Sequence, residues 1–106
     1  MSSTPPWRLK ELVPAEVTRC LARRPTLIVP VGSTEQHGAH LPLGIDTILV
    51  ERLADDLSAR FGILRAPAVE YAANCDPARA GPGSVALGRR VVQRVVIGVR
   101  GAWELG

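Results

Sequence analysis

Aromatic residues and lysine are scarce in this chain. Trp, Tyr and Phe make up 4% of its 106 residues, and Lys10 is the only lysine beside scattered arginines. A nucleic-acid-binding module would show a basic stripe with aromatic residues placed for base stacking. The net charge of +3 therefore reflects composition, and we expect no nucleic-acid partner.

Long apolar runs and paired cysteines are also missing. No segment stays apolar over the roughly 20 residues of a membrane-spanning helix, and the polar start lacks the charged and apolar regions of a secretory signal. Cys20 and Cys75 lie far apart and outside any C-x-x-C spacing, which is typical of unpaired thiols in a reducing compartment. We therefore expect a cytoplasmic protein without a membrane partner, in which Cys20 is a small core residue.

The length allows one small domain, residues 1–106. Residues 14–23 predict a helix, because a proline suits its first position and Pro25 ends it. Residues 26–31 form a short apolar run, which is typical of a strand buried on both faces of a sheet.

The following segments repeat this alternation. Residues 46–61 predict a helix that ends at Gly62, residues 63–71 a strand interrupted by Pro67, residues 74–83 a loop and residues 84–87 a short strand. The helix has an apolar face formed by Ile48, Leu49, Leu53, Ala54, Leu57 and Phe61. The order predicts an α/β fold with a parallel or mixed sheet flanked by helices.

The chemistry of the chain is concentrated in residues 32–46, directly after the apolar run of residues 26–31. Glu35 and His37 are two residues apart, so in an extended segment they point to the same side, and nearby glycines allow Asp46 to turn toward them. Carboxylates and imidazole without thiolate suit a catalytic zinc, manganese or iron site. We predict that these three side chains bind metal, at the strand end where open α/β sheets bind ligands.

Two residues of this loop have a second interpretation. Asp46 could instead cap the N-terminus of the following helix beside Thr47. His40 would supply either a fourth ligand or a hydrogen bond that supports a ligating carboxylate. A single Glu or His near a strand end is more often solvated than ligating, so the metal hypothesis depends on the cluster.

The run Gly-Ser-Thr-Glu-Gln-His-Gly-x-His-Leu-Pro-Leu-Gly-x-Asp over residues 32–46 resembles the signature of the creatininase (creatinine amidohydrolase) family. The resemblance covers residues 7–87 and includes Gly81-Pro82-Gly83-Ser84, which is similar to a Phe-Pro-Gly-Thr turn of the family. It implies a layered α/β fold, an often hexameric homo-oligomer and two divalent ions, zinc or manganese with iron as a further option. In members with two ions, the positions matching Glu35 and His37 each bind one ion, and the position matching Asp46 bridges both.

The resemblance implies metal-dependent hydrolysis of a cyclic or linear amide C–N bond by activated water. This suits a chain without a serine-triad pattern. The implied substrates are creatinine, a formamide-like intermediate, or a modified peptide such as the mycofactocin precursor.

Residues 88–106 form a divergent tail. After the Gly-Pro-Gly-Ser turn the resemblance implies a helix and then a strand with an Asn-Gly-His-Gly-Gly-Asn-like motif, but the chain continues with valines and arginines. These valines (Val92, Val95, Val96 and Val99) could line a helix, which Gly98 and β-branching would weaken. A membrane or nucleic-acid surface is a second, less favoured interpretation of the tail, because it lacks aromatic anchors.

The sequence therefore predicts a partial, truncated creatininase-like domain. Two functions stay open: a metal-dependent amidohydrolase, and a non-catalytic fragment that acts as a subunit or interaction piece. A half domain would leave a sheet edge and apolar helix faces uncovered, which predicts self-association.

Overall fold

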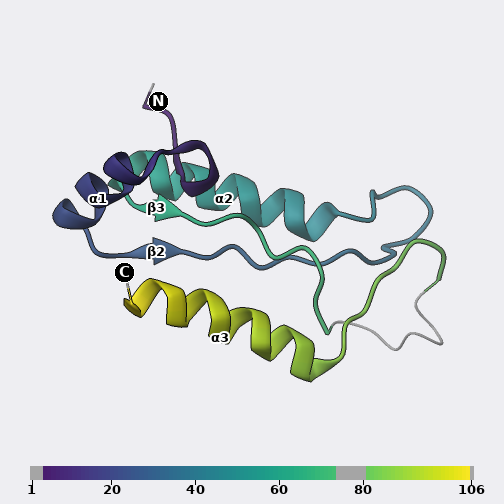
Figure 1. Ribbon diagram of the computed structural model, residues 1–106. Coiled ribbons are helices and arrows are strands. Elements are labelled where there is room, and N and C mark those ends of the chain that lie inside the picture. The colour runs from purple at the N-terminus through teal and green to yellow at the C-terminus, as the bar shows by residue number, and fades with distance from the viewer. Residues whose placement is uncertain (1–3, 74–80, 106) are drawn as a thin grey trace.

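The computed structural model describes residues 4–73 and 81–105, with side chains up to Gly101. In this part of the chain, strands and helices alternate (Figure 1). In chain order they are β1 (Trp7–Arg8), the 3-10 helix η1 (Leu9–Glu11), α1 (Pro14–Arg23), β2 (Leu27–Ile28), α2 (Ile45–Phe61), β3 (Leu64–Arg65) and α3 (Arg89–Leu105). The strands form one parallel sheet in the order β1-β3-β2. The α/β class predicted from the sequence is confirmed.

Proline and glycine define the ends of the first two α-helices. Pro14 occupies the start of α1, and the Glu16 carboxylate accepts a hydrogen bond of 3.1 Å from the Val13 amide. Gly62 ends α2 in the left-handed conformation, with φ of 65°, which glycine adopts at little cost. Both helices lie within one residue of their predicted bounds.

The strands are shorter than the apolar runs that predicted them. Only Leu27 and Ile28 of residues 26–31 join the ladder to β3, although an isolated bridge between Val31 and Val69 continues the pairing toward the loop. The ladder ends before Pro30. The Pro30 carbonyl accepts a hydrogen bond of 2.9 Å from the Val69 amide, but a proline has no amide hydrogen to donate back to the facing strand. The predicted burial of residues 26–31 on both faces is wrong, since β2 lies at the edge of the sheet that the described residues form and Val29 is 37% exposed.

Helix α2 packs on β1 and β3 through small and polar residues. Thr47, Ala54 and Ser58 are its buried residues. Of the predicted apolar face, only Ala54 is buried, and four large side chains form an exposed apolar stripe along the helix (Leu49, Leu53, Leu57 and Phe61) with exposures between 36% and 62%. Short side chains face the sheet, so the helix lies close to it. Elsewhere in the described core, Cys20 is 2% exposed, as predicted.

Buried polar groups join the elements. Ser58 Oγ accepts a hydrogen bond of 2.7 Å from the Trp7 amide and donates one of 2.6 Å to the Ile63 carbonyl. Asp55 accepts hydrogen bonds from Arg8 and from Arg65, which is 4% exposed. Hydrogen bonding to Arg8, followed by that to Arg65, holds the pKa of the Asp55 carboxyl below its ordinary value.

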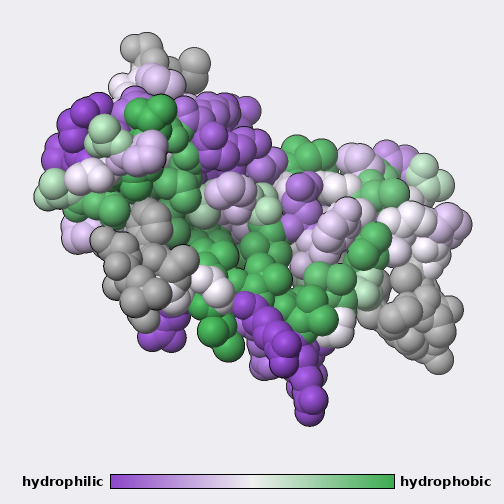
Figure 2. All heavy atoms as spheres, viewed as in Figure 1, coloured by the Kyte–Doolittle hydropathy of each residue, from purple (hydrophilic) through white to green (hydrophobic). Residues whose placement is uncertain are grey.

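Helix α3 lies on the opposite side of the strands from α2 (Figure 1). A cavity of about 370 Å³ separates it from the sheet, lined by Pro25, Leu27, Val29, Val31, Val69, Val96, Val99 and Arg100. Apolar side chains gather across this face, between the strands and α3 (Figure 2). The side of the sheet that faces α3 is therefore incompletely filled.

Two further observations concern the sequence predictions. Within the described ranges, no helix combines the length and the apolar character needed to span a membrane. Cys75 and most of the predicted loop 74–83 lie outside the described residues.

Candidate metal site

The candidate site is a loop that leaves β2 and returns to the first turn of α2. The Gly32 amide donates a hydrogen bond of 2.8 Å to the Val69 carbonyl, and the Thr34 hydroxyl donates one of 3.0 Å to the Glu70 carbonyl. The Glu35 amide donates to the Leu43 carbonyl at 3.0 Å and closes the loop. Asp46 then follows as the second residue of α2.

The Gly-Pro-Gly-Ser turn supports this loop from a distant part of the sequence. Ser84 Oγ accepts a hydrogen bond of 2.7 Å from the Gln36 amide, and the Val85 amide donates one of 2.8 Å to the Thr34 carbonyl. Gly81 has a φ of 76°, and a Cβ there would lie 2.6 Å from Gln36 Oε1. The positive φ favours glycine at this position, whereas the end of the Gln36 side chain could move away from an added Cβ.

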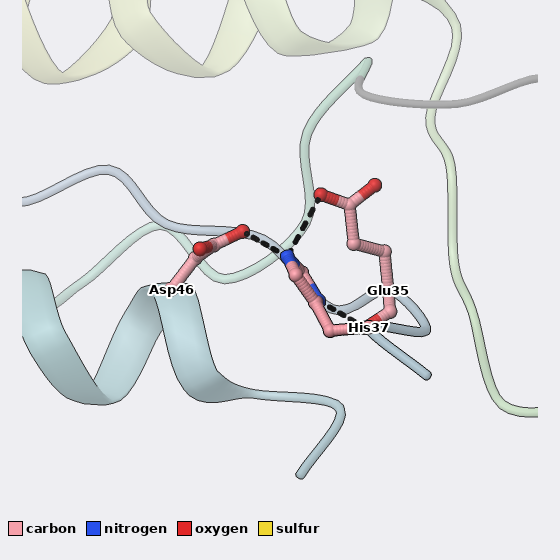
Figure 3. Close-up of side chains that lie close together, drawn as sticks. All are labelled: Glu35, His37 and Asp46. Carbon is pink, nitrogen blue, oxygen red and sulfur yellow. Dashed lines mark hydrogen bonds and ion pairs between the residues drawn. The ribbon is translucent and has the colours of Figure 1, made fainter. Parts of the chain in front are cut away.

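Glu35, His37 and Asp46 point toward one another from the loop and the start of α2 (Figure 3). His37 Nε2 lies 3.3 Å from Asp46 Oδ2 and 3.7 Å from Glu35 Oε1. One ligand atom from each residue lies within 4.8 Å of the other two. The side chains are 24%, 29% and 43% exposed for Glu35, His37 and Asp46, so solvent reaches the cluster.

The backbone orients the imidazole. His37 Nδ1 lies 2.9 Å from the Glu35 carbonyl oxygen, which can only accept a hydrogen bond, so Nδ1 carries the hydrogen. In the neutral ring Nε2 then presents its lone pair toward the two carboxylates. Metal-ligating histidines are held in this way by a hydrogen bond from their other nitrogen.

The two separations measured from His37 Nε2 suit a small divalent ion. Zinc bonds of about 2.0–2.2 Å at a tetrahedral angle place two ligand atoms about 3.3–3.6 Å apart. The two separations from His37 Nε2, 3.3 and 3.7 Å, lie close to this range. Three protein ligands with a solvent-accessible position are typical of a catalytic rather than a structural zinc site.

Two alternatives for the loop can now be compared with the structure. Gly44 is the N-cap of α2, and no side-chain capping hydrogen bond is present there, so the N-cap interpretation of Asp46 is wrong. His40 is exposed and lies outside the cluster of three, and its supporting role stays a prediction.

Sequence reasoning missed Ser33. Its hydroxyl donates a hydrogen bond of 2.7 Å to Asp46 Oδ2, and the residue is 5% exposed. The available signals were its position beside the glycine that enters the loop and its place in the run that resembles the family signature. A serine at such a position is not distinguishable from an ordinary turn residue by sequence alone.

Known proteins resemble this chain in sequence over a segment that includes the candidate site. The sequence model for creatininase (creatinine amidohydrolase) matches residues 10–102. The mycofactocin precursor peptide peptidase of Mycolicibacterium smegmatis is 37% identical over 79 residues, which cover 69% of this chain and 32% of that protein. The 3-dehydro-scyllo-inosose hydrolase of Thermotoga maritima is 33% identical over 81 residues, which cover 76% of this chain and 26% of that protein.

Solved structures show the same fold. A creatininase variant of the Zn-Zn type superimposes with a TM-score of 0.81 at 24% identity, over 89% of this chain and 38% of that one. A structure named creatininase Mn gives a TM-score of 0.70 at 26% identity, over 78% of this chain and 34% of that one. This chain thus spans about a third of the length of the curated relatives and solved structures named here. With the family sequence model matching most of its residues, the chain belongs to the creatininase family.

Proposed function

We propose that this chain forms the metal-binding part of a creatininase-type amidohydrolase, which hydrolyses an amide C–N bond with water. The observation that carries the proposal is the convergence of Glu35, His37 and Asp46. Carboxylate and imidazole ligands suit zinc and manganese, the ions in the names of the two creatininase structures.

Each residue of the cluster has a distinct role in this proposal. His37 offers Nε2 because the Glu35 carbonyl fixes its ring, while Glu35 and Asp46 offer carboxylate oxygens on either side of that nitrogen. When bound, a divalent ion polarises the substrate carbonyl and lowers the pKa of a bound water toward neutrality. The partial exposure of all three side chains leaves room for that water and for the amide.

The convergence of the three side chains supports a site for one ion, whereas the family resemblance implies two. A second ion would need further ligands in addition to the same carboxylates, as in sites where a carboxylate bridges two metals about 3.5–4 Å apart. We propose a homo-oligomeric assembly, and either a modified peptide or a small amide as the substrate. The names of the relatives, which include a peptidase of the mycofactocin precursor, support this range.

A non-catalytic role as a subunit is the second candidate. The exposed apolar stripe of α2 and the cavity beneath α3 favour it, because both offer apolar surface for another polypeptide. The two candidates differ in whether the bound metal is accompanied by hydrolysis.

The test is the metal content per chain after incubation with zinc or manganese and gel filtration. We expect one to two ions per wild-type chain, and loss of binding in His37→Ala and Glu35→Gln. Glu70→Gln is the matched control, because Glu70 is an exposed carboxylate outside the cluster. Absence of bound metal, or equal binding by His37→Ala and wild type, would refute the site.

If metal binds, a screen of amides and modified peptides then separates the two candidates. Hydrolysis that disappears in His37→Ala supports the amidohydrolase. Metal binding without hydrolysis supports the subunit role.

A further inference from the structure

Asp46 is the most exposed ligand of the proposed site, and its carboxylate needs a partner to stay aligned. Its side chain is 43% exposed, against 24% for Glu35. The last torsion of an aspartate is broad and roughly two-fold. Without a fixed partner, Asp46 would therefore spend much of its time turned away from His37.

Ser33 supplies such a partner from beneath the site. Its hydroxyl donates a hydrogen bond of 2.7 Å to Asp46 Oδ2, the same oxygen that lies 3.3 Å from His37 Nε2. Ser33 is only 5% exposed, so water competes little for this donor. A carboxylate oxygen has two acceptor positions, and one stays available after the serine has bound.

The main chain of Ser33 is itself fixed to α2. Thr47 Oγ1 donates a buried hydrogen bond of 3.1 Å to the Ser33 carbonyl. The preceding Gly32 lies so close to α2 that a Cβ there would collide with Thr47. The serine can therefore not move far relative to the first turn of the helix, which carries Asp46.

We propose that Ser33 is a positioning residue for the metal site, which holds Asp46 Oδ2 in the direction required for binding, and that Thr47 holds Ser33 in place. The proposal rests on the proposed function. Ser33 does not contact the ion. Residues that orient metal ligands typically contribute about 10–100-fold to metal affinity.

The experiment compares zinc affinity, measured by competition with a chromophoric chelator, between Ser33→Ala and Thr34→Val. Thr34 is the matched control, because its hydroxyl also donates a hydrogen bond from this loop but to the Glu70 carbonyl rather than to a ligand. We expect a loss of about 10–100-fold in Ser33→Ala, little change in Thr34→Val, and recovery in Ser33→Thr. Thermal unfolding of each metal-free variant shows whether a loss of affinity merely follows a loss of fold.

Unchanged affinity in Ser33→Ala, or an equal loss in Thr34→Val, would overturn the proposal. If Ser33→Ala does not fold, Thr47→Val provides the test, because it removes only the hydroxyl that holds the Ser33 carbonyl. Weaker zinc binding in that variant supports the proposal, and wild-type binding overturns it. Two other results would refute the proposed metal site rather than the role of Ser33. These are wild-type protein that binds no zinc, and a His37→Ala variant that binds zinc as tightly as wild type.

Discussion

Ser58 is a buried polar group that joins α2 to the sheet. It is fully buried, and its hydroxyl joins the Trp7 amide to the Ile63 carbonyl. Ser58→Ala would leave both backbone groups without this partner. Each buried group left unsatisfied costs about 1–3 kcal/mol, so we expect a loss of about 2–4 kcal/mol in the free energy of unfolding, since water can reach part of each group.

Such a loss is large for a chain with so few fully buried apolar side chains in its described part. It corresponds to a decrease of roughly 10 °C or more in the midpoint of thermal unfolding. Urea unfolding followed by circular dichroism, repeated at several protein concentrations, measures it. Zinc affinity should change little, because Asp46 lies at the other end of α2.

Thr18→Ala is the control for Ser58→Ala. Thr18 also donates a hydroxyl hydrogen bond to a backbone carbonyl, that of Pro14 at 3.1 Å, but it is exposed. Exposed substitutions of this kind change stability by about 0.5 kcal/mol or less. If Ser58→Ala destabilised the protein no more than Thr18→Ala, the role assigned to the buried hydroxyl would be refuted.

Three further predictions concern charge, close packing and the uncovered surface. Asp55→Asn should lower the free energy of unfolding by roughly 2–3 kcal/mol at pH 7, less than for a fully buried pair, because the carboxylate is 19% exposed. The folded-state pKa of Asp55 lies below its ordinary 3.8, so this carboxylate stabilises the fold above about pH 4 and loses that effect as the pH falls through the folded-state pKa. If the urea midpoint changed by the same amount between pH 7 and pH 3 in wild type and in Asp55→Asn, this prediction would be contradicted. Gly32→Ala should destabilise the fold by about 1–3 kcal/mol or more and weaken zinc binding, because the new Cβ collides with Thr47; normal folding and affinity would show that the loop can move away from α2. Leu53→Lys should reduce self-association in gel filtration, whereas Ile48→Lys, at a position 53% exposed but outside the apolar stripe, should not; equal elution of both variants would rule out the stripe as the contact surface.

The ends of the helices and the proximity of Glu35 to His37 were predictable because local chemistry determines them. Pro14 and Gly62 have restricted or unusual backbone preferences that act on the chain regardless of its neighbours. Glu35 and His37 are two residues apart, so their proximity needs only an extended segment. Such features depend on a few neighbouring residues and can be predicted from short stretches of sequence.

Burial could not be predicted in the same way, because it depends on which elements meet. The apolar periodicity of α2 identifies a stripe that needs a partner, but the described sheet instead receives Ala54 and Ser58. The ladder between β2 and β3 is short because Pro30 has no amide hydrogen to donate to the facing strand, and the facing strand is known only once the two segments are paired. Ser33 and Ser58 look like ordinary serines until the fold places a partner within reach.

The candidate metal cluster is held by local hydrogen bonds, whereas the apolar surfaces of the described chain lack a covering partner. The three candidate ligands are held by hydrogen bonds within the described chain: the loop closure between Glu35 and Leu43, the contact of Gln36 with Ser84, and the hydrogen bond from Ser33 to Asp46. The apolar stripe of α2 and the cavity beneath α3, in contrast, expose apolar side chains that take no part in these hydrogen bonds. Metal affinity should therefore depend on the local loop, whereas the proposed hydrolysis would depend also on the groups that cover these surfaces and complete the coordination. It follows that metal binding can persist under conditions where turnover is absent, and that the amount of bound zinc, measured in the His37 and Ser33 variants, tests the site more directly than the rate of any reaction.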